Sequence, residues 1–166
     1  AKEAFLKAAH IAHSTGREVS FSLSDRFCVD RHRKELLNLI NAHIDILFAN
    51  EEEIVSLFQV STFHEALAAV REKCGVVAIT RGALGCVIVQ EDNVHEIEAE
   101  TVNNLVDTTG AGDAFAAGFL ASYAQGYDMY LAGRVGNIAA SEVISHTGAR
   151  SAVPLKKLVA ERLNVN

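Results

Sequence analysis

The stretch NLVDTTGAGDAFAAGFL (residues 104–120) places two glycines and one aspartate directly ahead of an apolar helix. Gly110, Ala111 and Gly112 leave no bulky side chain around the backbone amides at the start of that helix. The first N–H groups of a helix lack partners within it, and the helix dipole places about half a positive charge there. The stretch therefore predicts an anion site suited to a phosphate or to the charge that develops in phosphoryl transfer.

Asp113 follows these small residues, although a carboxylate repels a phosphate. Its presence is explained if it accepts a proton from an attacking hydroxyl group. An aspartate that caps its own helix is the structural alternative, and the spacing alone does not separate the two. Two better-known glycine motifs do not match: the chain has no GxxxxGK[ST], and Phe115 stands where GxGxxG requires its last glycine.

The composition is that of one ordinary globular domain. The 166 residues are 49% hydrophobic and 22% charged, which allows a single hydrophobic core. A net charge of −6 argues against a nucleic-acid surface. No apolar run approaches the roughly 20 residues that span a bilayer, and no basic-then-apolar leader opens the sequence. Three scattered cysteines, with no CxxC pair, predict free thiols in a reducing compartment, so the cytoplasm is the expected location.

Hydrophobic periodicity predicts helices that alternate with strands. The expected strands lie at residues 18–23, 44–50, 76–90 (two strands around a turn at 81–85) and 93–102; the expected helices lie at 1–16, 30–43, 51–58, 62–75, 112–126, 129–148 and 154–163. This alternation predicts an α/β domain whose mostly parallel sheet is covered by helices on both faces. Ligands of such sheets bind at the carboxyl ends of strands, where Asn50 and the turn from Thr80 to Gly82 fall.

The segment DTTGAGDAFAAGFL (107–120) resembles the C-terminal signature of the ribokinase-like sugar and nucleoside kinases, often called the PfkB family. SDRFCVDRHR (24–33) and ANEEE (49–53) further resemble the bacterial adenosine kinases. The resemblance implies a ribokinase-like, Rossmann-like fold. It covers residues 1–166 as the C-terminal, nucleotide-binding and phosphoryl-transfer part of a kinase domain, truncated at its N-terminus and without the acceptor half.

The resemblance also implies a role for each motif. Asp113 corresponds to the catalytic base, and the amides of Gly110, Ala111, Gly112 and Asp113 correspond to an anion hole for the γ-phosphoryl group of ATP. An NxxE element that holds Mg²⁺ largely through water matches Asn50 and Glu53. A turn that lies along ATP, together with a position beside the adenine pocket, matches Thr80, Gly82, Gly85 and Asn137.

A monovalent-cation site next to the anion hole is a further implication of the resemblance, with K⁺ as the candidate ion. It aligns with Asp107 and the backbone of Thr109, Val143, His146 and Gly148.

Several of these assignments have structural alternatives. The helix dipole alone explains three glutamates at residues 51–53, and residues 80–85 could form an ordinary hairpin turn. Asn137 could serve packing in its helix of small residues, and His146 could be structural. His10 and His13 are three residues apart on a helix without an acidic partner at suitable spacing, so we expect them at the surface rather than on a metal.

The expected function is an ATP-dependent phosphotransferase that acts on an alcohol group of a small-molecule nucleoside, with adenosine preferred. A sugar kinase of the ribokinase or fructokinase type is one alternative, and a non-catalytic nucleotide-binding module or half-enzyme is the other. We expect no nucleic-acid or membrane partner, and a homodimer or a separate N-terminal half as the protein partner. The chain begins without Met and inside a helical pattern, which predicts that it is a piece of a longer protein.

Overall fold

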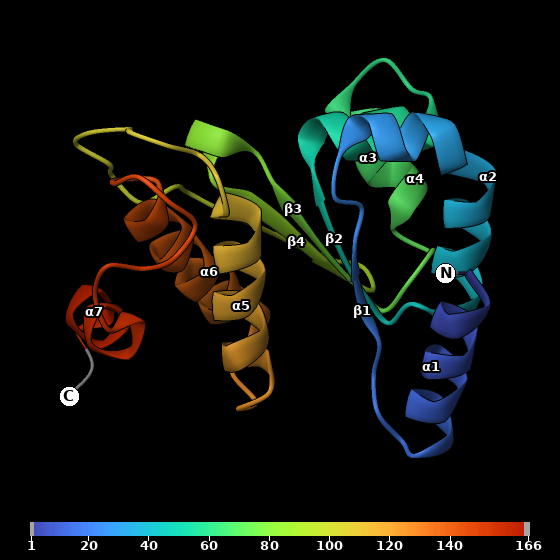
Figure 1. Ribbon diagram of the computed structural model, residues 1–166. Helices are drawn as coiled ribbons and strands as arrows, with labels where there is room; N and C mark the ends of the chain where they lie inside the picture. The colour runs from blue at the N-terminus through green and yellow to red at the C-terminus, as the bar shows by residue number, and fades with distance from the viewer. Residues whose placement is uncertain (1, 165–166) are drawn as a thin grey trace. The chain divides into compact units, whose positions relative to one another are not determined.

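The computed structural model describes residues 2–164 and shows an α/β protein (Figure 1). Its five strands follow one another in the order β1-β2-β3-β4-β5 within one sheet. The chain forms two compact units. The first takes in the residues up to Thr80 together with Val89–Val94, and the second takes in Arg81–Ile88 and the residues from His95 onward.

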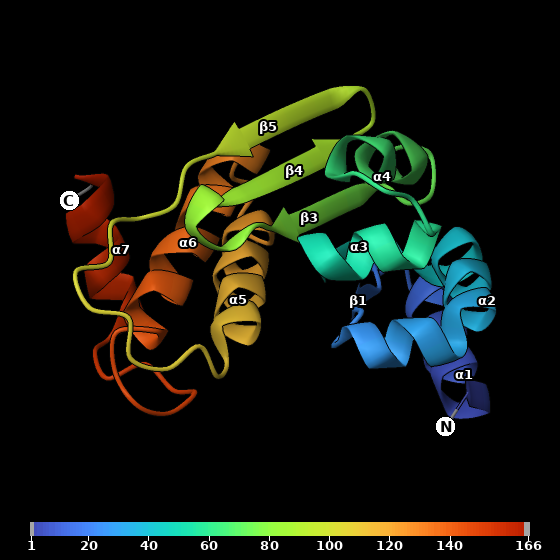
Figure 2. The same cartoon turned by 90° about the horizontal axis from the view of Figure 1, so that it is seen from above.

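Parallel strands and four helices build the first unit. Its elements are α1 (Lys2–Ser14), β1 (Ser20–Ser22), α2 (Arg26–His43), β2 (Ile46–Asn50), α3 (Glu51–Phe58), α4 (Phe63–Val70) and β3 (Val76–Thr80). Strand β2 pairs in parallel with both β1 and β3, which confirms the parallel pairing expected from the sequence. Helix α3 packs against α2, α4 and β2, and it contributes the fully buried Ile54 and Leu57 to the core (Figure 2).

Two capping boxes fix where α3 and α4 begin. Asn50 accepts a hydrogen bond from the N–H of Glu53 at 2.8 Å, and the Glu53 carboxylate accepts from the N–H of Asn50 at 2.8 Å. Thr62 and Glu65 form the same reciprocal pair at the start of α4, with distances of 3.2 Å and 2.9 Å. Each box supplies partners for N–H groups that a helix start otherwise leaves unpaired.

Three helices and a hairpin belong largely to the second unit. Its elements are the 3₁₀ helix η1 (Gly82–Leu84), most of β4 (Cys86–Gln90) and β5 (Asn93–Ile97), and helices α5 (Ala111–Tyr123), α6 (Met129–Val143) and α7 (Leu155–Leu163). Figure 2 shows β4 and β5 running in opposite directions, joined by a two-residue turn. Helix α5 packs along α6, and Phe115, Phe119 and Ile138 are buried in this unit.

Several element boundaries differ from the expected ones. Helix α6 ends at Val143 rather than 148, because residues 144–153 turn away as a loop in which Gly148 has φ +101°. Strand β5 ends at Ile97 rather than 102, and α4 ends at Val70 rather than 75. The turn expected at 81–85 contains a short 3₁₀ helix instead of a plain hairpin turn. Alternation and periodicity do not register such ends, because contacts distant in sequence decide them.

The free thiols expected from the sequence are confirmed. Cys28, Cys74 and Cys86 carry no disulfide. Burial raises the pKa of the Cys74 thiol to about 11 and that of the Cys86 thiol to about 12, so both stay protonated at neutral pH.

None of the helices within residues 2–164 combines the length and apolar character needed to cross a membrane.

We predict that Asn50→Ala and Thr62→Ala each lower the free energy of unfolding by about 1 kcal/mol, because each removes the side-chain acceptor of a capping box. Urea unfolding followed by circular dichroism measures the change. Thr62→Ser keeps a hydroxyl acceptor and is the control. A Thr62→Ser protein as unstable as Thr62→Ala would contradict the capping explanation.

Candidate functional site

The predicted anion site lies in the second unit, at the start of α5. Gly110 is the N-cap residue of this helix and has φ +80°, with no side chain to bond the first amides. The N–H of Ala111 donates to the carbonyl of Thr108 at 3.1 Å. Within residues 2–164 the N–H groups of Gly112 and Asp113 donate to no other group. Two backbone donors at the positive end of a helix dipole are therefore available to an anion.

Gly110 and Gly112 differ sharply in their surroundings. A Cβ atom at Gly110 would lie 2.6 Å from the Cβ of Ala149, and the left-handed conformation would strain it as well. A Cβ atom at Gly112 would meet no atom within 4 Å. The loop that carries Ala149 thus closes one side of the turn, while the side at Gly112 is open.

Asp113 is exposed and occupies the third helical position of α5. Gly110, not Asp113, is the N-cap, so the alternative in which Asp113 caps its own helix does not describe this structure. Among residues 2–164 no hydrogen bond or ion pair engages its carboxylate. The Asp113 carboxylate lies in the first turn of α5, beside the amides that are available to an anion. It can therefore accept a proton from a group that approaches these amides.

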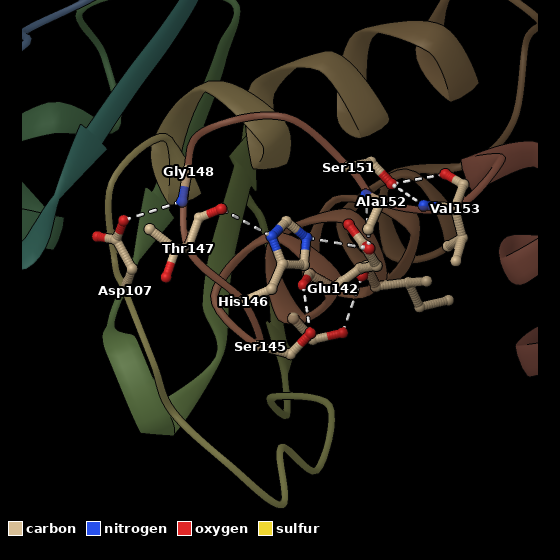
Figure 3. Close-up of polar contacts among 11 residues, drawn as sticks. Asp107, Glu142, Ser145, His146, Thr147, Gly148, Ser151, Ala152 and Val153 are labelled. Atoms are coloured by element: carbon tan, nitrogen blue, oxygen red, sulfur yellow. Dashed lines mark hydrogen bonds and ion pairs between the residues drawn. The ribbon is translucent and has the colours of Figure 1, made fainter.

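Asp107 draws together three of the five residues assigned to the cation site. Its Oδ1 accepts from the N–H of Thr109 at 2.9 Å. Its Oδ2 accepts from the N–H of Gly148 at 3.1 Å, as Figure 3 shows. Hydrogen bonds from Thr109, followed by that from Gly148, hold the pKa of the Asp107 carboxyl below its usual range. A carboxylate is an oxygen donor that suits a hard cation, so Asp107 fits the ion that the resemblance implies, although both of its oxygens also accept a backbone hydrogen bond.

The other two residues of that set lie close by in the chain but make different contacts. Val143 is the buried last residue of α6. The His146 ring lies in the loop beyond it, where its Nε2 contacts the carboxylate of Glu142 at 3.2 Å. The His146 ring is therefore held by a side chain, which leaves the role assigned to the His146 backbone as a prediction.

Glu142 is a site-adjacent residue that the sequence reasoning missed. Its side chain is 8% exposed, and its Oε1 accepts from the His146 ring and from the N–H of Ala152 at 2.9 Å. Burial by itself raises the pKa of the Glu142 carboxyl, but hydrogen bonds from Ser151, Ala152 and His146 outweigh it, and the pKa falls below its usual value. A glutamate four residues before a histidine, in a helix of small residues, was the available signal.

In the first unit, Asn50 and Glu53 are brought together at the carboxyl end of β2. Asn50 is the register partner of Thr80, the last residue of β3. Asn50, Glu53 and Thr80 therefore all lie at the carboxyl ends of neighbouring strands. The Asn50 amide also donates to the second Glu53 oxygen at 2.9 Å. Glu53 is 5% exposed, and burial raises the pKa of its carboxyl, with the N–H of Asn50 acting in the opposite direction.

These contacts bear on how a magnesium ion could be held. Both Glu53 oxygens already accept one hydrogen bond, and within residues 2–164 no three His, Cys, Asp or Glu side chains gather as a metal cluster. Carboxylate and amide oxygens are nevertheless the donors that Mg²⁺ prefers, and Mg²⁺ usually keeps several of its waters. The pair therefore fits the water-mediated role implied by the resemblance rather than direct coordination.

The remaining predicted residues lie in the second unit around η1. The N–H of Arg81 donates to the carbonyl of Gly85 at 2.8 Å, and a Cβ at Gly85 would lie 2.0 Å from the carbonyl oxygen of Ile97. Asn137 is 7% exposed, and its amide donates to the carbonyl of Glu98 at 2.9 Å. This bond favours the packing alternative for Asn137, because it fixes the chain that leaves β5.

His10 and His13, expected at the surface, are both exposed. His13 contacts the Asp45 carboxylate at 2.8 Å, and Asp45 also accepts from the N–H of Val19 at 2.6 Å. The acidic partner comes from 32 residues away, which spacing along the helix could not reveal.

Comparisons with known proteins identify the family of this chain. The family model described as pfkB family carbohydrate kinase matches residues 1–156. A nucleoside kinase of Methanocaldococcus jannaschii is 33% identical over 133 residues, which are 80% of this chain and 43% of the relative. The chain thus spans about half the length of the curated relatives that it matches.

Two solved structures superimpose closely. A probable sugar kinase protein from Rhizobium etli CFN 42 shares 43% identity with a TM-score of 0.95, covering 98% of this chain and 49% of that one. Adenosine kinase from Sinorhizobium meliloti shares 39% identity with a TM-score of 0.93, covering 99% of this chain and 50% of that one.

We predict opposite effects on stability for Gly110→Ala and Gly112→Ala. The first adds a methyl group against Ala149 at positive φ and should cost about 1–3 kcal/mol of unfolding free energy. The second adds a methyl group in open space within a helix and should be neutral or stabilise by about 0.5–1 kcal/mol. Urea unfolding of both variants measures the difference. Equal losses in the two would show that the contact with Ala149 is not what constrains Gly110.

Proposed function

This chain belongs to the pfkB family of carbohydrate kinases, and from that premise we propose that residues 1–166 are the nucleotide-binding and phosphoryl-transfer part of an ATP-dependent kinase. The acceptor is an alcohol group of a nucleoside, with adenosine preferred. The start of α5 carries the proposal, because open amides and an unengaged carboxylate meet there. Phosphoryl transfer requires this combination: a fixed positive field for the phosphoryl oxygens and a base for the attacking hydroxyl.

In the proposed mechanism, Asp113 accepts the proton of the acceptor hydroxyl as the hydroxyl oxygen bonds to the γ-phosphorus, and the bond from that phosphorus to the β–γ bridging oxygen breaks, so that ADP leaves. The amides of the turn from Gly110 to Asp113 hold the negative charge on the phosphoryl oxygens, and the open side at Gly112 leaves room for that group. A carboxylate repels a phosphate, so Asp113 would also weaken ATP binding. The chain's contribution is thus position and field rather than covalent chemistry.

The nucleotide and its ions are assigned to the other residues that match the family's motifs. Thr80, Gly82 and Gly85 would lie along ATP. Asn50 and Glu53 would hold Mg²⁺ through water, and that ion, when bound, neutralises phosphate charge. Asp107, with the backbone of Thr109, Val143, His146 and Gly148, would hold a monovalent cation, for which K⁺ is the candidate.

The acceptor is proposed from two observations. Residues 24–33 resemble bacterial adenosine kinases, and the S. meliloti adenosine kinase matches 99% of this chain. The R. etli relative, a probable sugar kinase, favours a sugar acceptor as the second candidate. In either case the acceptor site is completed by an N-terminal half or by a second copy of the chain. Three cysteines without a disulfide support a cytoplasmic setting.

We predict that Asp113→Asn lowers turnover about 10²–10⁴-fold, because it removes the proton acceptor, while ATP affinity is unchanged or higher. ADP release from MgATP is measured with the complete protein over a panel of nucleosides and sugars, and ATP affinity is measured by calorimetry. Asp128→Asn is the matched control, since Asp128 caps α6 and asparagine caps equally well.

Undiminished turnover in Asp113→Asn would refute Asp113 as the base. Turnover with a sugar but not with adenosine would replace the nucleoside acceptor. ATP binding without turnover on any acceptor would favour the non-catalytic module.

We also predict that Asn50→Ala weakens MgATP binding about tenfold, whereas Thr62→Ala leaves it unchanged. Both variants lose one cap acceptor, but only Asn50 lies at the proposed magnesium site. Calorimetric titration with MgATP, and with ATP in EDTA, measures the affinities. If the two variants bind MgATP equally, Asn50 serves only the helix.

A further inference from the structure

The geometry points to Glu142 as a positioning residue: it fastens the loop after α6 so that Gly148 meets Asp107 and Ala149 closes on Gly110. The role of that loop in phosphoryl transfer rests on the proposed function, but its fastening does not. The residues that match the family's motifs do not include Glu142. Its carboxylate contacts the loop after α6, not the turn from Gly110 to Asp113.

Glu142 holds the loop at two points. Its Oε1 accepts from the His146 ring at 3.2 Å and from the N–H of Ala152 at 2.9 Å, so one buried oxygen spans the segment between them (Figure 3). The side chain is 8% exposed and sits on the last turn of α6, whose residues are packed against α5. The anchor is therefore part of the rigid core of the second unit, not of the mobile end of a surface chain.

The fastened segment makes both contacts that shape the proposed site. Gly148 donates its N–H to Asp107 Oδ2 at 3.1 Å, while the other Asp107 oxygen accepts from Thr109, the residue before Gly110. Ala149 packs against Gly110: a Cβ atom added at Gly110 would lie 2.6 Å from the Cβ of Ala149. A shift of the loop would move Gly148 and Ala149 together. The turn from Gly110 to Asp113 would then lose its contact with Ala149.

Within residues 2–164, Asp107 also holds the loop through the N–H of Gly148, but Asp107 does not lie on a helix. The N–H of Val106 donates to the carbonyl of Ile144 at 2.9 Å, which fixes the start of the loop. The Ser151 hydroxyl, whose hydrogen bond also lowers the pKa of Glu142, lies 2.6 Å from the carbonyl oxygen of Val153 at the loop's end. Between these points, in the part of the chain that the structure describes, Glu142 is the residue that ties the loop back to a helix.

The test compares Glu142→Ala with Glu142→Gln by backbone-amide hydrogen exchange, followed by NMR on this chain. In Glu142→Ala, we expect the amides of Gly148 and Ala152 to exchange about tenfold faster or more, because charge-assisted hydrogen bonds are lost. Amides of the first unit, such as that of Leu47, should keep their rates. Glu142→Gln retains an acceptor oxygen and should restore most of the protection. Glu161→Ala, an exposed glutamate on α7, is the matched control and should change neither amide.

Unchanged protection of Gly148 in Glu142→Ala would overturn the inference. So would equal loss in the Ala and Gln variants, or faster exchange throughout α6, because each would indicate general destabilisation instead of loop positioning. ATP affinity is measured on the same samples. If the unsubstituted chain binds no ATP, the proposed function fails on that result alone, while the exchange rates of Gly148 still decide the role of Glu142.

Discussion

The second unit depends on one backbone position that suits glycine alone. Gly110 turns the chain at φ +80° into α5, with Ala149 too close to admit even a methyl group. After that turn, no side chain covers the first amides of the helix. Asp113 follows Gly110 by three residues, within the first turn of α5. The fold thus creates the anion site through a constraint on shape, and charge enters only afterwards through the helix dipole.

In the first unit, the same atoms serve both the fold and the proposed chemistry. Asn50 and Glu53 close a capping box that starts α3, and the carboxylate is buried while doing so. The structural and functional interpretations of this motif are therefore not exclusive. A carboxylate whose oxygens are already oriented by hydrogen bonds is preorganised, and a bound ion would not have to order it.

The local features could be predicted from the sequence, whereas the distant contacts could not. Small residues at 110–112 and an apolar run behind them indicate a helix start, and the structure begins α5 at Ala111. The end of α6 at Val143 was missed, because the loop that follows is held by Asp107, 41 residues away from Gly148. Glu142 was missed for the same reason: its partner Ala152 is joined to it by a turn that no periodicity encodes.

The contact between Gly110 and Ala149 has an evolutionary consequence. Ala149 is exposed, and residues in exposed loops usually change freely during divergence. Here, however, the Cβ of Ala149 lies against a glycine that has no room for a methyl group. We therefore expect substitutions at positions 110 and 149 to occur together. Because Ala149 is exposed, burial alone would not identify it as a constrained position.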